Sequence, residues 1–140
     1  MAEVEYLHVC DYAFAAEGGK PCIIGIFDVI RVSNFPATHP VMAVAMRFRG
    51  LAHEVMAIKI ELCRPNGDVL VTMQADVTGG PDGGAFVQVN MSGTQFPEPG
   101  RYTIKVSSAG RTLASHSLQV QKVQPPLQSA RPGADPKKFH

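Results

Sequence analysis

A carboxylate stands inside an apolar run of the sequence, and nearby bases could turn it into a polar site. Asp28 follows the run Ile23-Ile-Gly-Ile-Phe, so a strand through this segment would put its carboxylate on the same face as neighbouring isoleucines. A buried carboxylate costs several kcal/mol unless it is paired. Arg31, Arg47 or His39 could provide the partner. Because histidine titrates near neutral pH, such a group could bind an anion or act as an acid or base.

The same residues also fit a structural role. A carboxylate can fix the loop that follows it, or it can lie beside a β-bulge where the chain leaves the core. Perturbed ionisable groups occur in structural networks as well as in active sites. We therefore favour the structural interpretation of Asp28 and His39, and keep a small-ligand-binding protein or an enzyme as the alternative.

Other catalytic and metal-binding patterns are missing from the sequence. It contains no Gly-x-Ser-x-Gly elbow, no His-Glu-x-x-His and no phosphate-binding loop. A blue-copper centre takes two histidines, a cysteine and an axial methionine, and none of Cys10, Cys22 and Cys63 has a histidine within a few residues downstream. We therefore predict no metal and no cofactor, and we favour a non-enzymatic protein.

The elements that would position these residues are β-strands, because apolar residues recur with a period of two. Tyr102, Ile104 and Val106 alternate with polar residues, and similar alternation runs through residues 41–48, 55–62 and 87–91. This pattern is typical of strands with one buried face. No segment shows the period of a helix, so the sequence predicts an all-β domain.

Turn-forming residues divide the sequence into seven or eight expected strands. One of these strands is expected from about Cys22 to Val32, and the next one follows a loop at residues 34–40 that contains His39. Asn66-Gly67 indicates a hairpin with a type I′ turn, and Ala109-Gly110 joins the last two strands. Short antiparallel strands at this spacing favour a β-sandwich, with a small barrel as the alternative.

The segment Phe96-Pro-Glu-Pro-Gly-Arg-Tyr102 resembles the tyrosine corner of immunoglobulin-like sandwiches. In that motif a tyrosine beside a tight corner bonds an upstream backbone group through its hydroxyl. The resemblance implies that Gly100 and Tyr102 are structural residues. The sequence lacks the tryptophan and the cysteine pair of antibody domains, so the similarity concerns architecture and not function.

Three further segments carry a more particular resemblance. Cys10-Asp-Tyr-Ala13, Ile23-Ile-Gly-Ile-Phe-Asp28 and Phe35-Pro-Ala-Thr-His-Pro40 are similar to an uncharacterised family of small bacterial proteins. Together with the corner, this similarity covers most of residues 7–121. It implies a bacterial immunoglobulin-like sandwich and no established activity.

Composition and charge narrow the function classes further. Hydrophobic residues make up 45% of the 140 residues, as in a globular domain, and the net charge of +1 offers no basic surface for nucleic acid. No apolar run is long enough to span a membrane. An odd number of cysteines without a signal peptide indicates a cytoplasmic protein. We expect a sandwich domain at residues 1–122 and a Pro-rich disordered tail at residues 123–140.

Surplus apolar residues point to a partner. The second expected strand is apolar on both faces, yet each sheet of a sandwich has one face in solvent. The next two strands add small apolar residues at outward positions. We therefore predict a homo-oligomer, or a complex with another bacterial protein, formed through an apolar sheet face. The outward positions are Val41, Ala43, Ala45, Val55 and Ala57.

Overall fold

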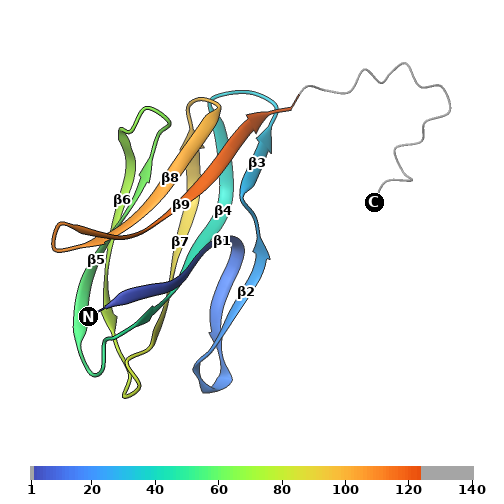
Figure 1. The fold of residues 1–140 in the computed structure, drawn as a ribbon. Helices are drawn as coiled ribbons and strands as arrows, with labels where there is room; N and C mark the ends of the chain where they lie inside the picture. Colours follow the sequence, from blue (N-terminus) through green and yellow to red (C-terminus); the bar gives the residue numbers. More distant parts are fainter. Residues whose placement is uncertain (1, 124–140) are drawn as a thin grey trace.

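Two β-sheets contain almost all of the chain in the computed structural model, which describes residues 2–123 (Figure 1). One sheet has the strand order β2-β1-β4-β7 and the other the order β3-β9-β8-β5-β6. The strands are β1 (Glu3–Ala16), β2 (Lys20–Ile26), β3 (Val29–Val32), β4 (Ala37–Arg49), β5 (Val55–Cys63), β6 (Val69–Thr78), β7 (Ala85–Phe96), β8 (Gly100–Ser108) and β9 (Arg111–Lys122), and a short 3-10 turn, η1 (Glu17–Gly19), joins the first two.

The all-β prediction is confirmed, but the described residues form nine strands and not seven or eight. The predicted disordered tail lies outside the described residues, apart from Val123. No helix within residues 2–123 is long and apolar enough to cross a membrane.

The extra strand arises because the segment expected as one strand, residues 22–32, is two strands in different sheets. Phe27 donates its backbone N–H to Val9 in β1, and one residue later the carbonyl of Asp28 accepts from Gln119 in β9. The chain thus crosses from one sheet to the other between these residues. β3 consequently lies parallel to β9, whereas every other strand pair in the described chain is antiparallel.

The core lies between the two sheets, where the alternation predicted it. In β4 the inward positions are completely buried, and they face β5 and β8, whose inward residues are buried as well. Burial of every second side chain removes apolar surface from water, and this stabilises the packing of the two sheets. The largest fully buried side chains include Met42, Met46, Phe48, Ile60, Leu62, Tyr102 and Ile104.

The two tight hairpins differ in turn type, and the Asn66-Gly67 hairpin does not have the type I′ turn that was expected for it. In the β5–β6 hairpin only Gly67 has a positive φ, and its N–H bonds the carbonyl of Arg64. Pro65 favours this type I turn because its ring sets φ for the first turn position. The type I′ pattern, with two positive φ values, occurs instead at Ala109 and Gly110 between β8 and β9.

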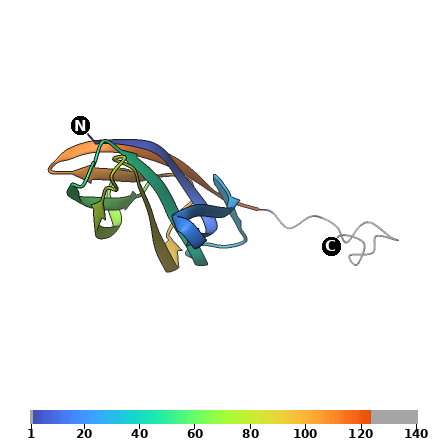
Figure 2. The ribbon, with the colours of Figure 1, turned by 90° about the horizontal axis from the view of Figure 1, so that it is seen from below.

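The β1–β2 hairpin and the β5–β6 hairpin lie on opposite sides of the molecule, as both views show (Figure 1, Figure 2). β2 is an edge of the four-stranded sheet, and β6 is an edge of the five-stranded sheet. The pocket beside β2 and the groove beside β6, both described below, therefore lie at different edges of the fold.

Candidate functional site

The corner before β8 has the contact that the tyrosine-corner resemblance implies. The Tyr102 hydroxyl donates to the carbonyl oxygen of Glu98 at 2.7 Å and accepts from the Glu98 N–H at 3.2 Å. The ring is fully buried and packs edge-on against Phe96. Gly100 has a φ of 141°, and a Cβ there would lie 2.7 Å from a carbon of Pro65. Tyr102 and Gly100 therefore hold the corner together.

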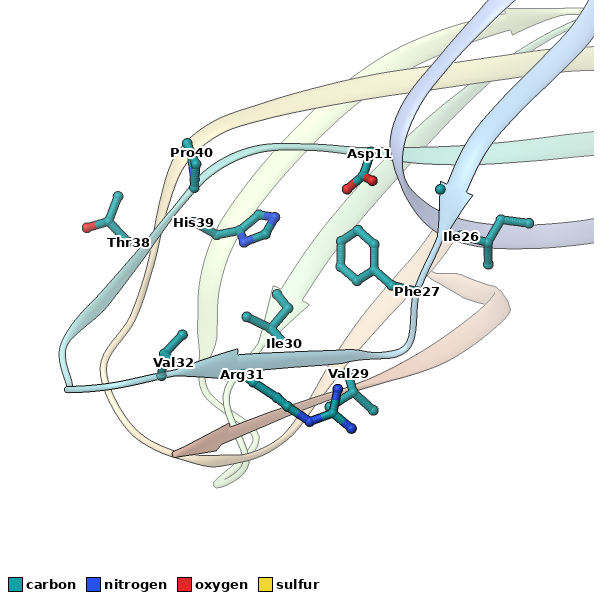
Figure 3. A pocket seen from close by; sticks show the side chains of 11 residues that line it. Asp11, Ile26, Phe27, Val29, Ile30, Arg31, Val32, Thr38, His39 and Pro40 are labelled. Carbon is teal, nitrogen blue, oxygen red and sulfur yellow. The ribbon is translucent and has the colours of Figure 1, made fainter. Parts of the chain in front are cut away.

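An open pocket of about 510 Å³ lies where β2, β3 and β4 meet (Figure 3). His39 is half-buried and contacts the ring of Phe27, with the ring centres 5.6 Å apart. Figure 3 shows Asp11 of β1 directed toward these two side chains, whereas Arg31 points to the opposite side of β3. Of the predicted candidates, His39 and Arg31 line this pocket, and only the His39 side chain is directed toward Phe27 and Asp11.

His39 lies within β4, opposite Thr94 of β7, and not on a loop as expected. The loop prediction was wrong because Pro40 was taken as a breaker. β4 begins at Ala37, and here the proline occupies a strand position.

Asp28 is neither buried nor paired with Arg31, Arg47 or His39. Its side chain is 68% exposed, and its Oδ1 lies 3.0 Å from Nε2 of His116 in β9. The expected burial assumed a continuous strand, but the chain changes sheets at this residue and turns the carboxylate outward. The contact ties the start of β3 to β9, which is a structural role.

Arg47 lies at the other end of β4 from His39. The eight intervening residue steps span about 26 Å in an extended strand. Its Nε is 3.2 Å from Oε1 of Glu5, whose second oxygen bonds Arg49 at 2.8 Å. Asp28, His39 and Arg47 therefore do not form one cluster, and the enzyme arrangement built on them is absent.

Sequence reasoning missed Asp11, which is the carboxylate that lines the pocket. A signal for it was present in Gly25, because a glycine inside a strand often marks a close approach. A Cβ at Gly25 would lie 2.3 Å from Oδ2 of Asp11. The pocket thus offers a carboxylate, an imidazole and an aromatic ring. Among residues 2–123, no three His, Cys, Asp or Glu side chains are grouped to hold a metal ion.

The outer face of the four-stranded sheet carries a second candidate site, a patch of exposed apolar side chains. Tyr12 lies directly opposite Ile24, and Cys10 lies opposite both Ile26 and Ala43, so these residues share one face. Five large side chains on this face are 45–61% exposed, and we call them the apolar face: Tyr12, Phe14, Ile24, Ile26 and Val41.

Beneath the apolar face, small residues are packed as tightly as a core. Cys10, Ala43 and Ala45 are completely buried although they point away from the main core, and Phe86 packs against them. The Cys10 thiol donates to the carbonyl oxygen of Ala43 at 3.6 Å. Burial raises the pKa of this thiol, and the charge of Asp11 raises it further.

The outward apolar residues that the sequence analysis grouped into one surface lie on two different sheets. Val41 belongs to the apolar face, whereas Val55 and Ala57 lie on β5 in the other sheet. Ile30 is buried in the main core. The expected surface therefore loses β5 and Ile30, and it gains Tyr12 and Phe14 of β1, which the sequence analysis did not predict.

These observations define an all-β domain of two packed sheets. The chain belongs to a family of unknown function, DUF6941, which matches residues 5–121. No curated protein matches the chain.

Parts of solved structures resemble the chain at low sequence identity. Part of the alkylpurine DNA glycosylase AlkC from Pseudomonas fluorescens, bound to DNA containing an abasic site analog, superposes with a TM-score of 0.52 and 11% identity, over 86% of this chain and 30% of that chain. For a β-D-glucoside glucohydrolase from Trichoderma reesei, the TM-score is 0.49 and the identity 12%, over 86% of this chain and 19% of that chain. For the β-glucosidase from Listeria innocua, in complex with isofagomine, the TM-score is 0.46 and the identity 10%, over 86% of this chain and 16% of that chain. The chain spans less than a third of each of these proteins, and the similarity concerns the fold alone.

Proposed function

We propose that the protein is a non-enzymatic interaction module of the bacterial cytoplasm, with an immunoglobulin-like sandwich, and that its apolar face binds a second copy of the chain. The observation that carries this proposal is the grouping of Tyr12, Phe14, Ile24, Ile26 and Val41 on one face. Scattered apolar residues are normal on a protein surface, but a contiguous group of them marks an interaction site.

The absence of charge on the apolar face supports a second copy as its partner. A two-fold symmetric interface brings the same patch of both copies together, so any charge at its centre would meet its own kind. All five side chains of the patch are uncharged, and the small residues beneath them are uncharged as well. Two such faces can therefore pack against each other without a repulsive pair.

The expected strength is that of a weak dimer. Complete burial of one large apolar side chain contributes about 1.5–3 kcal/mol, so each half-exposed side chain of the patch contributes roughly 1 kcal/mol. In a two-fold symmetric dimer each side chain is present in both copies, so its contribution to the binding free energy enters twice. A single substitution should therefore change the dissociation constant at least tenfold.

Sedimentation equilibrium over a range of protein concentrations tests the proposal with two matched variants. Ile24→Lys places a charge in the centre of the apolar face, whereas Val55→Lys makes the same kind of change at a residue that is 65% exposed in the other sheet. The wild type and V55K should form dimers, and I24K should remain monomeric at concentrations at least tenfold higher. A monomeric wild type, or equal dimerisation of both variants, would refute the proposal.

A further inference from the structure

We propose a second binding site on a different part of the molecule: an extended segment of a partner protein adds as a strand to the free edge of β7 and fills the groove between β6 and β7. The segment is uncharged and carries apolar side chains at alternate positions. This inference does not depend on the apolar face, which lies over β1, β2 and β4.

The four edge strands of the described chain differ in how they are protected against added strands. Native sheets blunt their edges with short strands, lysine, proline or irregular backbone. β2 contains Lys20, Pro21 and the positive-φ Gly25, and β3 has only four residues, one of which is Arg31. Both of these edges therefore carry such devices.

The edges on the other side of the molecule carry fewer of these devices, and the one positive φ in β7 is that of Gly93, at 62°. β6 has ten residues with Asp76 as its only charge, and β7 has twelve residues with no charge and no proline. A long uncharged edge presents a row of backbone N–H and C=O groups that an extended chain can pair with. Because β7 is uncharged, a charged segment would lose hydration there without gaining an ion pair, so an uncharged segment fits this edge best.

A groove of about 510 Å³ lies between these two edges. Met73 of β6 and Met91 of β7 line it together with Leu70 and Val71, and polar residues of β7 such as Gln95 form its border. Met73 and Met91 both point toward the core side of their sheets, because their pairing partners are the core residues Ile60 and Met42. A strand added to β7 would direct every second side chain into this groove.

The methionines suit such a site. A methionine side chain is unbranched and polarisable, so it adapts to ligands of different shape. The backbone of β7 would supply most of the affinity, and the groove would select for apolar side chains at alternate positions.

A synthetic peptide tests the inference. It alternates threonine with valine or leucine over eight residues, has one lysine beyond each end for solubility, and carries a fluorophore. Because backbone pairing carries the affinity, we expect this generic sequence to bind and to slow hydrogen exchange in residues 85–96. A second peptide with an N-methyl group on every residue of the strand, which removes the N–H donors from both edges, should bind at least tenfold more weakly.

Protein variants complete the test. Met73→Lys introduces a charge into the groove and should weaken peptide binding at least tenfold, whereas Met73→Leu should preserve it. Gln95→Lys changes the border of the groove without touching the core, so it should reduce affinity even if M73K fails to fold. I24K should bind the peptide normally, which separates this inference from the proposed dimer. No peptide binding, equal binding of the N-methylated peptide, or protection outside β7 would each overturn the inference.

Discussion

The outer faces of the two sheets are built from the same alternation but present opposite chemistry. On the five-stranded sheet, Glu61 lies directly opposite Lys105 on one side and Thr72 on the other, and its carboxylate is 3.9 Å from Nζ of Lys59. On the four-stranded sheet the outward positions of β2 and of the middle of β1 and β4 are apolar, and Ala43 and Ala45 are completely buried, whereas β7 contributes the polar residues Gln88, Asn90 and Ser92 to the same face. Water solvates the first face, whereas the second is packed like a partial core.

The difference shows what alternation does and does not determine. A period of two decides which residues face each other across the two layers, and both sheets satisfy it. The outward residues are free to vary, so their chemistry reports what lies outside the sheet. Water solvates a charged outward face, and the apolar outward face is the observation on which the proposed dimer rests.

The largest expected effect comes from placing a charge beneath the apolar face. Ala43→Lys would force a long charged side chain into a fully buried position, and we expect it to lower the free energy of unfolding by about 3 kcal/mol. Thr72→Lys, on the outer face of the five-stranded sheet, adds a charge opposite Glu61 and should change stability by about 0.5 kcal/mol or less. Urea denaturation monitored by circular dichroism measures both. Similar losses for the two variants would show that the two faces are equally solvated.

Two glycines with the same backbone conformation allow a finer comparison of the two sheets. Gly25 in β2 and Gly110 beside β9 have φ values of 73° and 79°. A Cβ at Gly110 meets nothing within 4 Å, whereas at Gly25 it meets the side chain of Asp11. Gly110→Ala should therefore lower the free energy of unfolding by about 1 kcal/mol, through backbone strain alone. Gly25→Ala should lower it by about 2 kcal/mol, because the contact with Asp11 adds to the same strain.

The same denaturation experiment identifies the source of the extra cost. In the double variant Gly25→Ala with Asp11→Ala, the side chain that clashes is gone, so the cost of the glycine substitution should fall to that of G110A. If it does not fall, the strain at Gly25 lies in the backbone and not in the contact with Asp11.

The interior of the fold could be predicted because its signal is local and repeated. Alternation through residues 41–48 and 101–106 marks a single buried face, and the structure buries those inward side chains. The change of sheet at Phe27 and Asp28 has no such signal, because the residues on both sides of it are apolar. A strand that is apolar on both faces looks the same whether it stays in one sheet or passes between two.

The candidate site could be predicted only in part, for a related reason. The partner of Asp28 is His116, 88 residues away along the chain, and only the pairing of β3 with β9 brings the two together. Asp11 of β1 and His39 of β4 likewise line one pocket because β1 pairs with β4. The apolar face was foreseen in part, at Ile24, Ile26 and Val41, because these residues are unusual within their own strands, whereas Tyr12 and Phe14 of β1 were not predicted.

The smallest expected effect concerns the buried cysteines beneath the two outer faces. Cys10 lies on the outer side of the four-stranded sheet and Cys63 on that of the five-stranded sheet, opposite Thr103. Because the pKa of Cys10 is raised above its ordinary value of 9.0, the folded state retains this proton at a pH where the unfolded chain has lost it. The contribution of Cys10 to stability is thus complete below pH 9 and declines as the pH rises above it.

Unfolding free energies measured at several pH values from 7 to 10 test this contribution. Cys10→Ala should lower stability at every pH, through the lost packing, and should flatten the decline above pH 9. The same substitution at Cys63 provides the control, because it removes a buried thiol from beneath the polar face. An unchanged alkaline slope in C10A would show that the thiol beneath the apolar face is solvated as readily as one in the unfolded chain.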